Sequence, residues 1–290
     1  MLKLNPSPIQ KVNWQLASEK SVSVDIKRDD LLHSVVSGNK WRKLKYLLAD
    51  AKDKKCSQII TMGGNWSNHL HAVAYAGKEL GFKTTGLVRA HAEQALTPTL
   101  KDCERWGMEL RFTSRKEYAK YREHKAWDAF YNTERGSYWF SEGGFSDLAI
   151  KGVTDIAQEV DKHYDYIVVG CGSGATLCGL AKAFPKSQIV GVAAFSGAEY
   201  LRDELTQYVG SHRDNWELDT AHHCGGFAKS SKALEQLIKE LEHSNAFSLD
   251  PVYNAKAFLA LESRLKSDAI ASGSKVLVLH TGGLQGARDL

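Results

Sequence analysis

The sequence predicts an α/β fold in which helices flank parallel sheets on both faces. Short runs rich in valine and isoleucine alternate with segments whose apolar residues recur at helical spacing. Apolar strands of this kind are typical of sheets buried on both faces, and their alternation with helices is typical of parallel α/β proteins. The 290 residues are enough for one large domain or two of moderate size.

The expected strands are short apolar runs bounded by polar or turn residues, and the expected helices follow them. The strands are residues 22–26, 58–62, 84–88, 166–169, 188–192 and 275–279. The helices are residues 41–51, 68–80, 98–106, 149–161, 176–184 and 231–242. Residues 114–138 are densest in charged and aromatic side chains, and we expect them in the outer part of a smaller lobe.

Composition argues against nucleic acid and membrane as partners. The net charge of +4 is small for this length. The basic residues between 111 and 122 alternate with acidic and aromatic ones, as on a solvated helix face. No apolar run approaches the roughly 20 residues that span a bilayer.

The cysteines predict a reducing compartment. Their number, five, is odd, they form no Cys-x-x-Cys pair, and the first residues carry no secretory signature. We therefore expect a cytoplasmic protein. His222-His223-Cys224 has no second ligand group at a useful spacing, so no metal site is expected.

A lysine in a turn of small residues is the first candidate for chemistry. Lys40 ends the segment Ser37-Gly38-Asn39-Lys40, and a helical pattern starts at Trp41. A lysine held where a loop meets a helix can form a Schiff base with a carbonyl compound. Taken alone, Lys40 is equally well interpreted as a solvated lysine.

A second turn follows the strand expected at residues 58–62. The chain passes through Gly63-Gly64-Asn65-Trp66, and Ser67 and Asn68 then open a helix. The free N–H groups of a helix start can bind an anion. Ser67 on its own is equally typical of a helix N-cap.

A glycine-rich loop follows the strand expected at residues 166–169. Gly170-Cys171-Gly172-Ser173-Gly174-Ala175-Thr176 leads into a helix, so that backbone N–H groups and the hydroxyls of Ser173 and Thr176 can surround a phosphate. The Gly-Lys-Ser/Thr of a Walker loop is missing. A phosphate monoester fits this pattern better than ATP or NAD, although a tight turn without ligand is as good an interpretation of the loop alone.

These motifs, in this order, resemble those of pyridoxal-phosphate enzymes with the tryptophan synthase β fold, also called fold type II. More closely, the chain resembles the 1-aminocyclopropane-1-carboxylate deaminase and D-cysteine desulfhydrase family. The resemblance covers nearly the whole chain and rests on several short segments. They are residues 27–30, 37–47, 63–69, 141–144, 250–253 and 280–283.

The resemblance implies pyridoxal 5'-phosphate as cofactor and a role for each matching residue. Lys40 would carry the cofactor as a Schiff base, and Asn68 would hydrogen-bond its 3-oxygen. Ser67 would lie beside the substrate carboxylate, and Tyr253 would line the same pocket. The phosphate would be held by Lys43, Ser173, Gly174, Ala175 and Thr176.

It also implies two lobes with the cofactor between them. The large cofactor-binding domain would comprise residues 1–43 and 139–290, and the small domain residues 44–138. A homodimer acting on a small amino-acid substrate is expected from the family.

Three departures from the deaminase pattern bear on the reaction. Asn254 stands where deaminases carry an acidic residue, Thr281 stands where they carry an apolar one, and Trp66 replaces a glutamine. A carboxylate facing the pyridine nitrogen makes the ring a stronger electron sink, whereas a threonine hydroxyl such as that of Thr281 can bond that nitrogen without supplying a charge. Opening a cyclopropane ring demands more of the sink than expelling sulfide from a β-carbon.

The sequence therefore predicts β-elimination, in which a small amino acid yields a 2-oxo acid and ammonia, as in D-cysteine desulfhydrases. Three alternatives stay open. The first is a 1-aminocyclopropane-1-carboxylate deaminase, and the second is a β-replacement enzyme of the cysteine synthase type. The third is a non-catalytic phosphate- or cofactor-binding protein.

Overall fold

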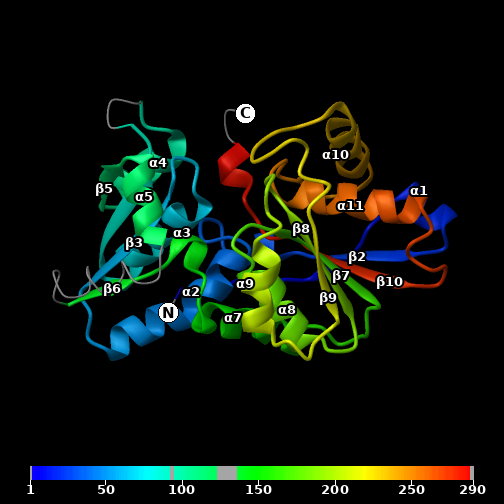
Figure 1. Cartoon of the computed structure of the whole chain (residues 1–290), viewed down its shortest axis with the longest axis horizontal. Helices are drawn as coiled ribbons and strands as arrows, with labels where there is room; N and C mark the ends of the chain where they lie inside the picture. Colours follow the sequence, from blue (N-terminus) through cyan, green and yellow to red (C-terminus); the bar gives the residue numbers. More distant parts are fainter. Residues whose placement is uncertain (1, 92–94, 123–135, 288–290) are drawn as a thin grey trace.

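The computed structural model describes residues 2–91, 95–122 and 136–287 and contains two sheets with helices packed on them (Figure 1). The larger sheet holds six strands in the order β1-β2-β10-β7-β8-β9. All of its pairs are parallel except β1 with β2. The strands are β1 (Ile9–Lys11), β2 (Ser23–Lys27), β7 (Tyr166–Cys171), β8 (Gln188–Ala193), β9 (Trp216–Asp219) and β10 (Lys275–Leu279).

Alternating side chains bury both faces of this sheet. In β7, Val168 joins one core while Ile167 and Val169 join the other, because successive side chains of a strand point to opposite faces. One face is covered by α1 (Gln15–Glu19), α10 (Lys232–Ser244) and α11 (Asn254–Lys266). The other is covered by α7 (Asp147–Thr154), α8 (Ala175–Ala183), α9 (Leu201–Val209) and the 3-10 helix η3 (Asp155–Glu159).

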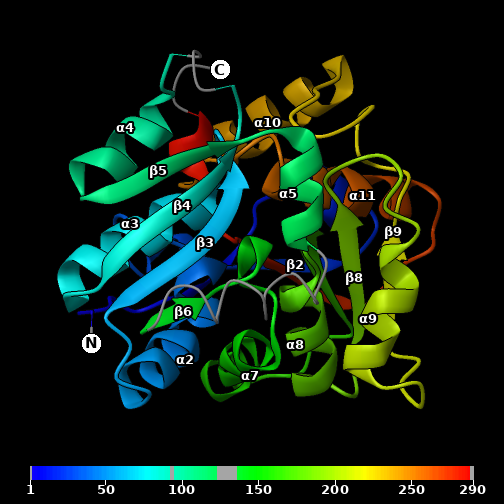
Figure 2. The same cartoon turned by 60° about the vertical axis from the view of Figure 1, so that its left-hand side comes forward.

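The smaller sheet is parallel throughout, in the order β5-β4-β3-β6. Its strands are β3 (Gln58–Gly64), β4 (Lys83–Arg89), β5 (Met108–Thr113) and β6 (Ser137–Trp139). One core contains side chains of α2 (Asn39–Asp53), α3 (Asn68–Leu80) and α4 (Pro98–Arg105). On the opposite face, α5 (Arg115–Arg122) adds Tyr118 to a smaller cluster (Figure 2).

The predicted fold class is confirmed, and the strongest sequence patterns locate their elements closely. β10 and α3 have the predicted bounds, and β3, β4, β7 and β8 extend the predicted runs by one or two residues. The prediction of a single helix over residues 149–161 is wrong in its second half. α7 ends at Thr154, and a separate 3-10 helix, η3, begins at Asp155. Residues 123–135 of the charged segment lie outside the described residues.

The predicted domain boundary at residues 43 and 44 falls inside α2, and Trp139 lies in β6 of the smaller sheet. The division into a domain of residues 1–43 with 139–290 and another of 44–138 stays a prediction. Two short 3-10 helices complete the frame of the site: η1 (Asp29–Leu31) before α2, and η2 (Glu142–Gly144) after β6. A fourth, η4 (Leu284–Ala287), lies near the C-terminus.

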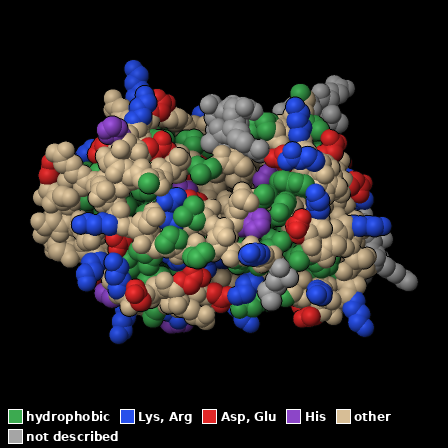
Figure 3. Space-filling model, turned by 180° about the vertical axis from the view of Figure 1, so that it is seen from behind, with side chains coloured by type: hydrophobic (Ala, Val, Ile, Leu, Met, Phe, Trp, Pro, Cys, Tyr) green, Lys and Arg blue, Asp and Glu red, His purple; other side chains and the backbone are tan. Residues whose placement is uncertain are grey.

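Within the described residues, no helix is long and apolar enough to cross a membrane. On the face shown in Figure 3, lysine and arginine side chains lie interspersed with acidic ones. This distribution agrees with the small net charge of +4.

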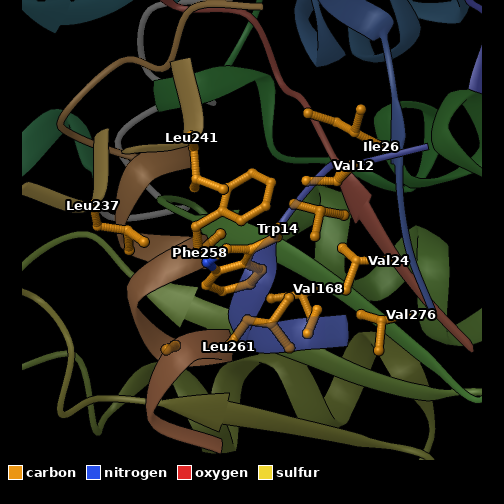
Figure 4. Packing of buried hydrophobic residues seen from close by; sticks show 14 of the residues in the cluster. Val12, Trp14, Val24, Ile26, Val168, Leu237, Leu241, Phe258, Leu261 and Val276 are labelled. Carbon is orange, nitrogen blue, oxygen red and sulfur yellow. The ribbon is translucent and has the colours of Figure 1, made fainter. Parts of the chain in front are cut away.

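The core beneath α10 and α11 centres on aromatic packing (Figure 4). Phe258 of α11 is fully buried, meets Trp14 edge-on at 5.9 Å and stacks on Phe247 at 6.1 Å between ring centroids. Leu237 and Leu241 of α10 join the same cluster. This packing fixes α11, whose first residue, Asn254, belongs to the candidate site.

Replacing Phe258 by Ala should lower the free energy of unfolding by about 3–5 kcal/mol, because the substitution leaves a cavity in a dry core. Urea unfolding followed by circular dichroism measures the change. Leu31→Ala serves as control, since Leu31 is exposed and surface substitutions stay within about 0.5 kcal/mol. Equal stability of the two variants would contradict the assigned packing.

Candidate active site

Lys40 lies in the first turn of α2, and a close contact between two backbone segments fixes its position. Gly38 precedes the helix with φ at +65°, and a Cβ on it would lie 1.8 Å from the carbonyl oxygen of Thr281. Only glycine fits both the conformation and the space. The N–H of Gly38 donates to the carbonyl oxygen of Asp29 at 2.9 Å. The Lys40 loop is thereby held between η1 and the segment after β10.

A buried ion network anchors the same turn of α2. Arg42 donates to both carboxylate oxygens of Asp29, at 2.5 and 2.6 Å, and to Glu159 at 2.8 Å. Lys27, fully buried, donates to Glu159 at 2.7 Å. Burial acts to raise the pKa of Glu159, but hydrogen bonds from Arg42 and Lys27 outweigh it and lower the pKa to about 2. The network ties α2 to β2 and η3.

The ammonium group of Lys40 is in surroundings that favour its neutral form. Burial first, and then the positive charge of Lys43, lower the pKa of Lys40 to about 7, while Asp250 opposes the shift. The Nζ atom donates to Oδ1 of Asn39 at 2.9 Å. At neutral pH a substantial share of Lys40 is a free amine, the form that attacks carbonyl carbons and accepts protons.

The glycine-rich loop and α2 meet at the start of α8. Asn39 donates from Nδ2 to the hydroxyl of Thr176 at 2.8 Å. Lys43 reaches the carbonyl oxygen of Gly143 at 3.4 Å and the hydroxyl of Ser173 at 3.5 Å. Burial lowers the pKa of Lys43 to about 8. A cation, two hydroxyls and the N-terminus of α8 therefore converge, which suits a phosphate group.

Glycines shape the backbone around these groups. A Cβ on Gly143 would lie 3.0 Å from the hydroxyl of Ser173, and Gly143 has φ at +66°. Gly174 begins α8 with φ at +89°, and a Cβ there would collide with Leu205.

A buried histidine, His69, lies close to Lys43 and has one ring nitrogen without a hydrogen-bond partner among the described residues. Nε2 of His69 bonds the hydroxyl of Thr61 at 2.8 Å, whereas its buried Nδ1 has no hydrogen-bond partner among the described residues. Burial, followed by the charges of Lys40 and Lys43, lowers the pKa of His69 well below its usual value. His69 is therefore neutral, and its Nδ1 is able to bond a ligand.

Ser67 and Asn68 lie where β3 passes into α3. The hydroxyl of Ser67 accepts from the N–H of Leu70 at 3.2 Å and so caps α3. A Cβ on Gly63 would lie 2.4 Å from that hydroxyl, so glycine is needed for the turn. The side chain of Asn68 accepts at Oδ1 from Nε2 of Gln285 at 2.8 Å.

Tyr253 packs against the strand that leads into the phosphate loop. A Cβ on Gly170 would lie 2.8 Å from Cβ of Tyr253, and one on Gly172 would lie 3.3 Å from its hydroxyl. Burial, with the charge of Asp250, raises the pKa of Tyr253, so the phenol keeps its proton. The ring of Phe227 meets that of Tyr253 edge-on at 6.0 Å.

Asp250 organises the start of α11. Its carboxylate accepts from the N–H groups of Val252, Tyr253 and Asn254 at 2.7–3.1 Å, and also from the Asn254 side chain. Burial raises the pKa of Asp250. Its oxygens are occupied within the helix start, which fixes Tyr253.

Asn254 and Thr281 form a neutral pair. Asn254 donates from Nδ2 to the carbonyl oxygen of Gly282 at 2.7 Å. Its Oδ1 accepts from the N–H of Thr281 at 2.9 Å and from the Thr281 hydroxyl at 3.2 Å. Oδ1 of Asn254 therefore has two donors, the backbone N–H and the hydroxyl of Thr281.

The structure brings the sequence-predicted site residues into one neighbourhood. Direct contacts link the Lys40 loop to Thr176 and Thr281, Lys43 to Ser173, and Tyr253 to Gly172. Gln285 connects Asn68 to the segment that carries Thr281. Their roles toward a cofactor stay predictions.

Sequence reasoning missed four residues of this neighbourhood: Asn39, His69, Asp250 and Gln285. The first three lie inside motifs that carried the family resemblance. Gln285 follows the last motif, where no periodic pattern marks it.

Comparison with known proteins identifies the family of the chain. The family model described as "Pyridoxal-phosphate dependent enzyme" matches residues 2–282. The bifunctional D-cysteine desulfhydrase/1-aminocyclopropane-1-carboxylate deaminase of Arabidopsis thaliana is 29% identical, over 98% of this chain and 78% of its own. The D-cysteine desulfhydrase of Yersinia enterocolitica is 26% identical, over 96% of this chain and 92% of its own.

A crystal structure described as that of the ACC deaminase homologue superposes with a TM-score of 0.84. It is 29% identical in sequence, and the match covers 99% of this chain and 92% of that one. The two chains thus share their fold over nearly all of this chain.

In the apoprotein, labelling of Lys40 by an amine-reactive reagent should rise with pH around a midpoint of about 7, because only the neutral amine reacts. Lys43→Met should move this midpoint upward, since it removes the neighbouring positive charge. Peptide mass spectrometry of quenched samples measures the labelled fraction. Lys43→Arg keeps the charge and should leave the midpoint in place; an equal rise in both variants would refute the electrostatic cause.

Proposed function

We propose that this chain, which belongs to the pyridoxal-phosphate dependent enzymes, eliminates the β-substituent of a small amino acid and releases a 2-oxo acid and ammonia. D-Cysteine, with sulfide as the leaving group, is the substrate we favour. The carrying observation is that the Lys40 loop touches both the phosphate cradle, through Thr176, and the neutral Asn254–Thr281 pair, through the Thr281 carbonyl.

Bound pyridoxal phosphate supplies an electron sink for negative charge at the α-carbon of the substrate. Lys43, Ser173, Gly174, Ala175 and Thr176 would hold its phosphate, Asn68 its 3-oxygen, and Lys40 its carbonyl carbon. The neutral amine of Lys40 serves as the base that takes the α-proton, because its lowered pKa of about 7 suits proton transfer at neutral pH.

The start of α3 and the phenol of Tyr253 would position the substrate. Ser67 and the N–H groups of the first turn of α3 offer donors and a positive helix end to the substrate carboxylate. The phenol of Tyr253, whose pKa is raised by burial, keeps its proton and can donate a hydrogen bond to the substrate. Asp250 fixes the backbone from which the phenol extends.

We favour elimination over ring opening because Asn254 and Thr281 carry no charge. Asn254 has both ends of its amide bonded within the protein, and Thr281 offers only a hydroxyl to the pyridine nitrogen. The carboxylate of Asp250 accepts from the N–H groups of Val252 and Asn254, just before and at the start of α11. Without a charged partner at its nitrogen, the pyridine ring of the cofactor would stabilise negative charge at the α-carbon less strongly. This weaker stabilisation suffices for a substrate whose leaving group departs readily.

Deamination of 1-aminocyclopropane-1-carboxylate is the second candidate. It is supported by the Arabidopsis relative, whose name joins both activities at 29% identity. Trp66, half-buried in the turn before Ser67, stands at the position that would shape the pocket for either substrate.

We also propose a cytoplasmic homodimer. All five cysteines are free, which suits a reducing compartment. The dimer is an expectation from the family, and sedimentation velocity tests it.

Purified protein should be yellow and should release 2-oxo acid from D-cysteine or β-chloro-D-alanine. Lys40→Ala should reduce turnover about 100- to 10,000-fold, because it removes both the attachment point and the base. A screen of D- and L-amino acids with 1-aminocyclopropane-1-carboxylate measures product. Lys186→Ala, at an exposed position, is the control. A borohydride-reducible cofactor adduct at another lysine of Lys40→Ala would contradict the assignment.

The double variant Asn254→Glu/Thr281→Leu should raise kcat/KM for 1-aminocyclopropane-1-carboxylate relative to D-cysteine, because it places a carboxylate near the pyridine nitrogen. Asn254→Gln/Thr281→Leu has the same size without the charge and should not change the ratio. Paired assays of both substrates give the result. Efficient ring opening by the unmodified protein would sink this explanation.

A further inference from the structure

We propose that Gln285 is a positioning residue that holds the amide of Asn68 with its NH2 group toward the cofactor. Through this contact the C-terminal turn η4 would decide which end of Asn68 meets the 3-oxygen. The inference rests on the proposed function, because it acts through the cofactor contact assigned there to Asn68.

In the structure, Gln285 is the donor and the side chain of Asn68 the acceptor of this contact. Nε2 of Gln285 donates to Oδ1 of Asn68 at 2.8 Å. An asparagine amide has one accepting end and one donating end. Once Oδ1 is bonded to Gln285, the end that remains for a ligand is the NH2 group.

The surroundings of Gly283 agree with this orientation. Gly283 has φ at +96°, and a Cβ on it would lie 3.1 Å from Nδ2 of Asn68 and 3.7 Å from Oδ1 of Asp250. The donating end of Asn68 thus lies on the side where the chain passes a buried carboxylate. A side chain at position 283 would displace Asn68 or Asp250.

The segment that precedes Gln285 is held in place by several contacts. Asn254 bonds both the carbonyl oxygen of Gly282 and the N–H of Thr281. A Cβ on Gly282 would lie 2.5 Å from the hydroxyl of Ser37, so the same segment packs on the loop before Lys40. From there η4 reaches the start of α3, between the two sheets (Figure 1).

The orientation matters because the 3-oxygen of the cofactor is an acceptor. The NH2 group of Asn68 stabilises it with a hydrogen bond, whereas Oδ1 in the same place would repel it. Glutamate at position 285 can only accept when ionised, so it would pull the NH2 group of Asn68 toward itself and turn Oδ1 to the cofactor.

The test compares holoenzyme variants by two readouts besides turnover: the visible absorption of the bound cofactor against pH, and the rate of cofactor loss on dilution. Gln285→Glu should alter the spectrum and speed cofactor loss about tenfold, and Gln285→Ala about threefold, because it leaves Asn68 free to turn without forcing it. Leu284→Ala, an exposed neighbour in the same turn, should match the unmodified protein.

Asn68→Ala separates this inference from the proposed function. Gln285→Glu should change nothing further in the Asn68→Ala background, since its effect passes through Asn68. The inference is overturned if Gln285→Glu behaves like Leu284→Ala while Asn68→Ala alters the spectrum, or if its effect persists without Asn68. If Asn68→Ala itself leaves the spectrum unchanged, the inference falls, whereas elimination activity that depends on Lys40 still supports the proposed function.

Discussion

The site depends on the buried pair of Arg42 and Asp29. Arg42 lies two residues after Lys40 and one before Lys43, and its guanidinium makes two hydrogen bonds to Asp29, which is fully buried. Removing one partner of a buried ion pair costs about 3–5 kcal/mol, although Glu159 would still face Arg42 and Lys27 would still face Asp29. The pair therefore fixes the first turn of α2, and with it the directions of both lysines.

A second constraint acts on the same turn from the opposite end of the chain. Gly38 lies against the carbonyl oxygen of Thr281 so closely that no Cβ fits between them. The loop before Lys40 and the segment after β10 are consequently in direct contact, so that the position of one fixes that of the other. Because Asn254 holds that segment and Gln285 extends it to Asn68, a displacement at any of these points would be felt at the others.

Sequence patterns predict the bounds of an element wherever one physical signal dominates its segment. β10 and α3 have the predicted bounds because an uninterrupted apolar run marks the strand, and Ser67 and Gly81 mark the ends of the helix. β9 and α11 are among the elements that the patterns do not predict. β9 has only four residues at the edge of the sheet, too few for their alternation to stand out. α11 has buried residues around most of its circumference, which blurs the helical period. The hydrogen bond from Gln285 to Asn68 joins residues 217 apart and leaves no local pattern.

Asn254 links the charge of the site to the hydrogen bonds that hold the C-terminal segment. Its Nδ2 donates to the carbonyl oxygen of Gly282, while its Oδ1 accepts from Thr281. An ionised acidic residue at this position could accept from Thr281, but it has no proton for Gly282, whose buried carbonyl would then need another donor. Asn254 thus supplies the donor that holds the C-terminal segment. The absence of a charge at position 254 and a tightly held C-terminal turn are two consequences of the same side chain.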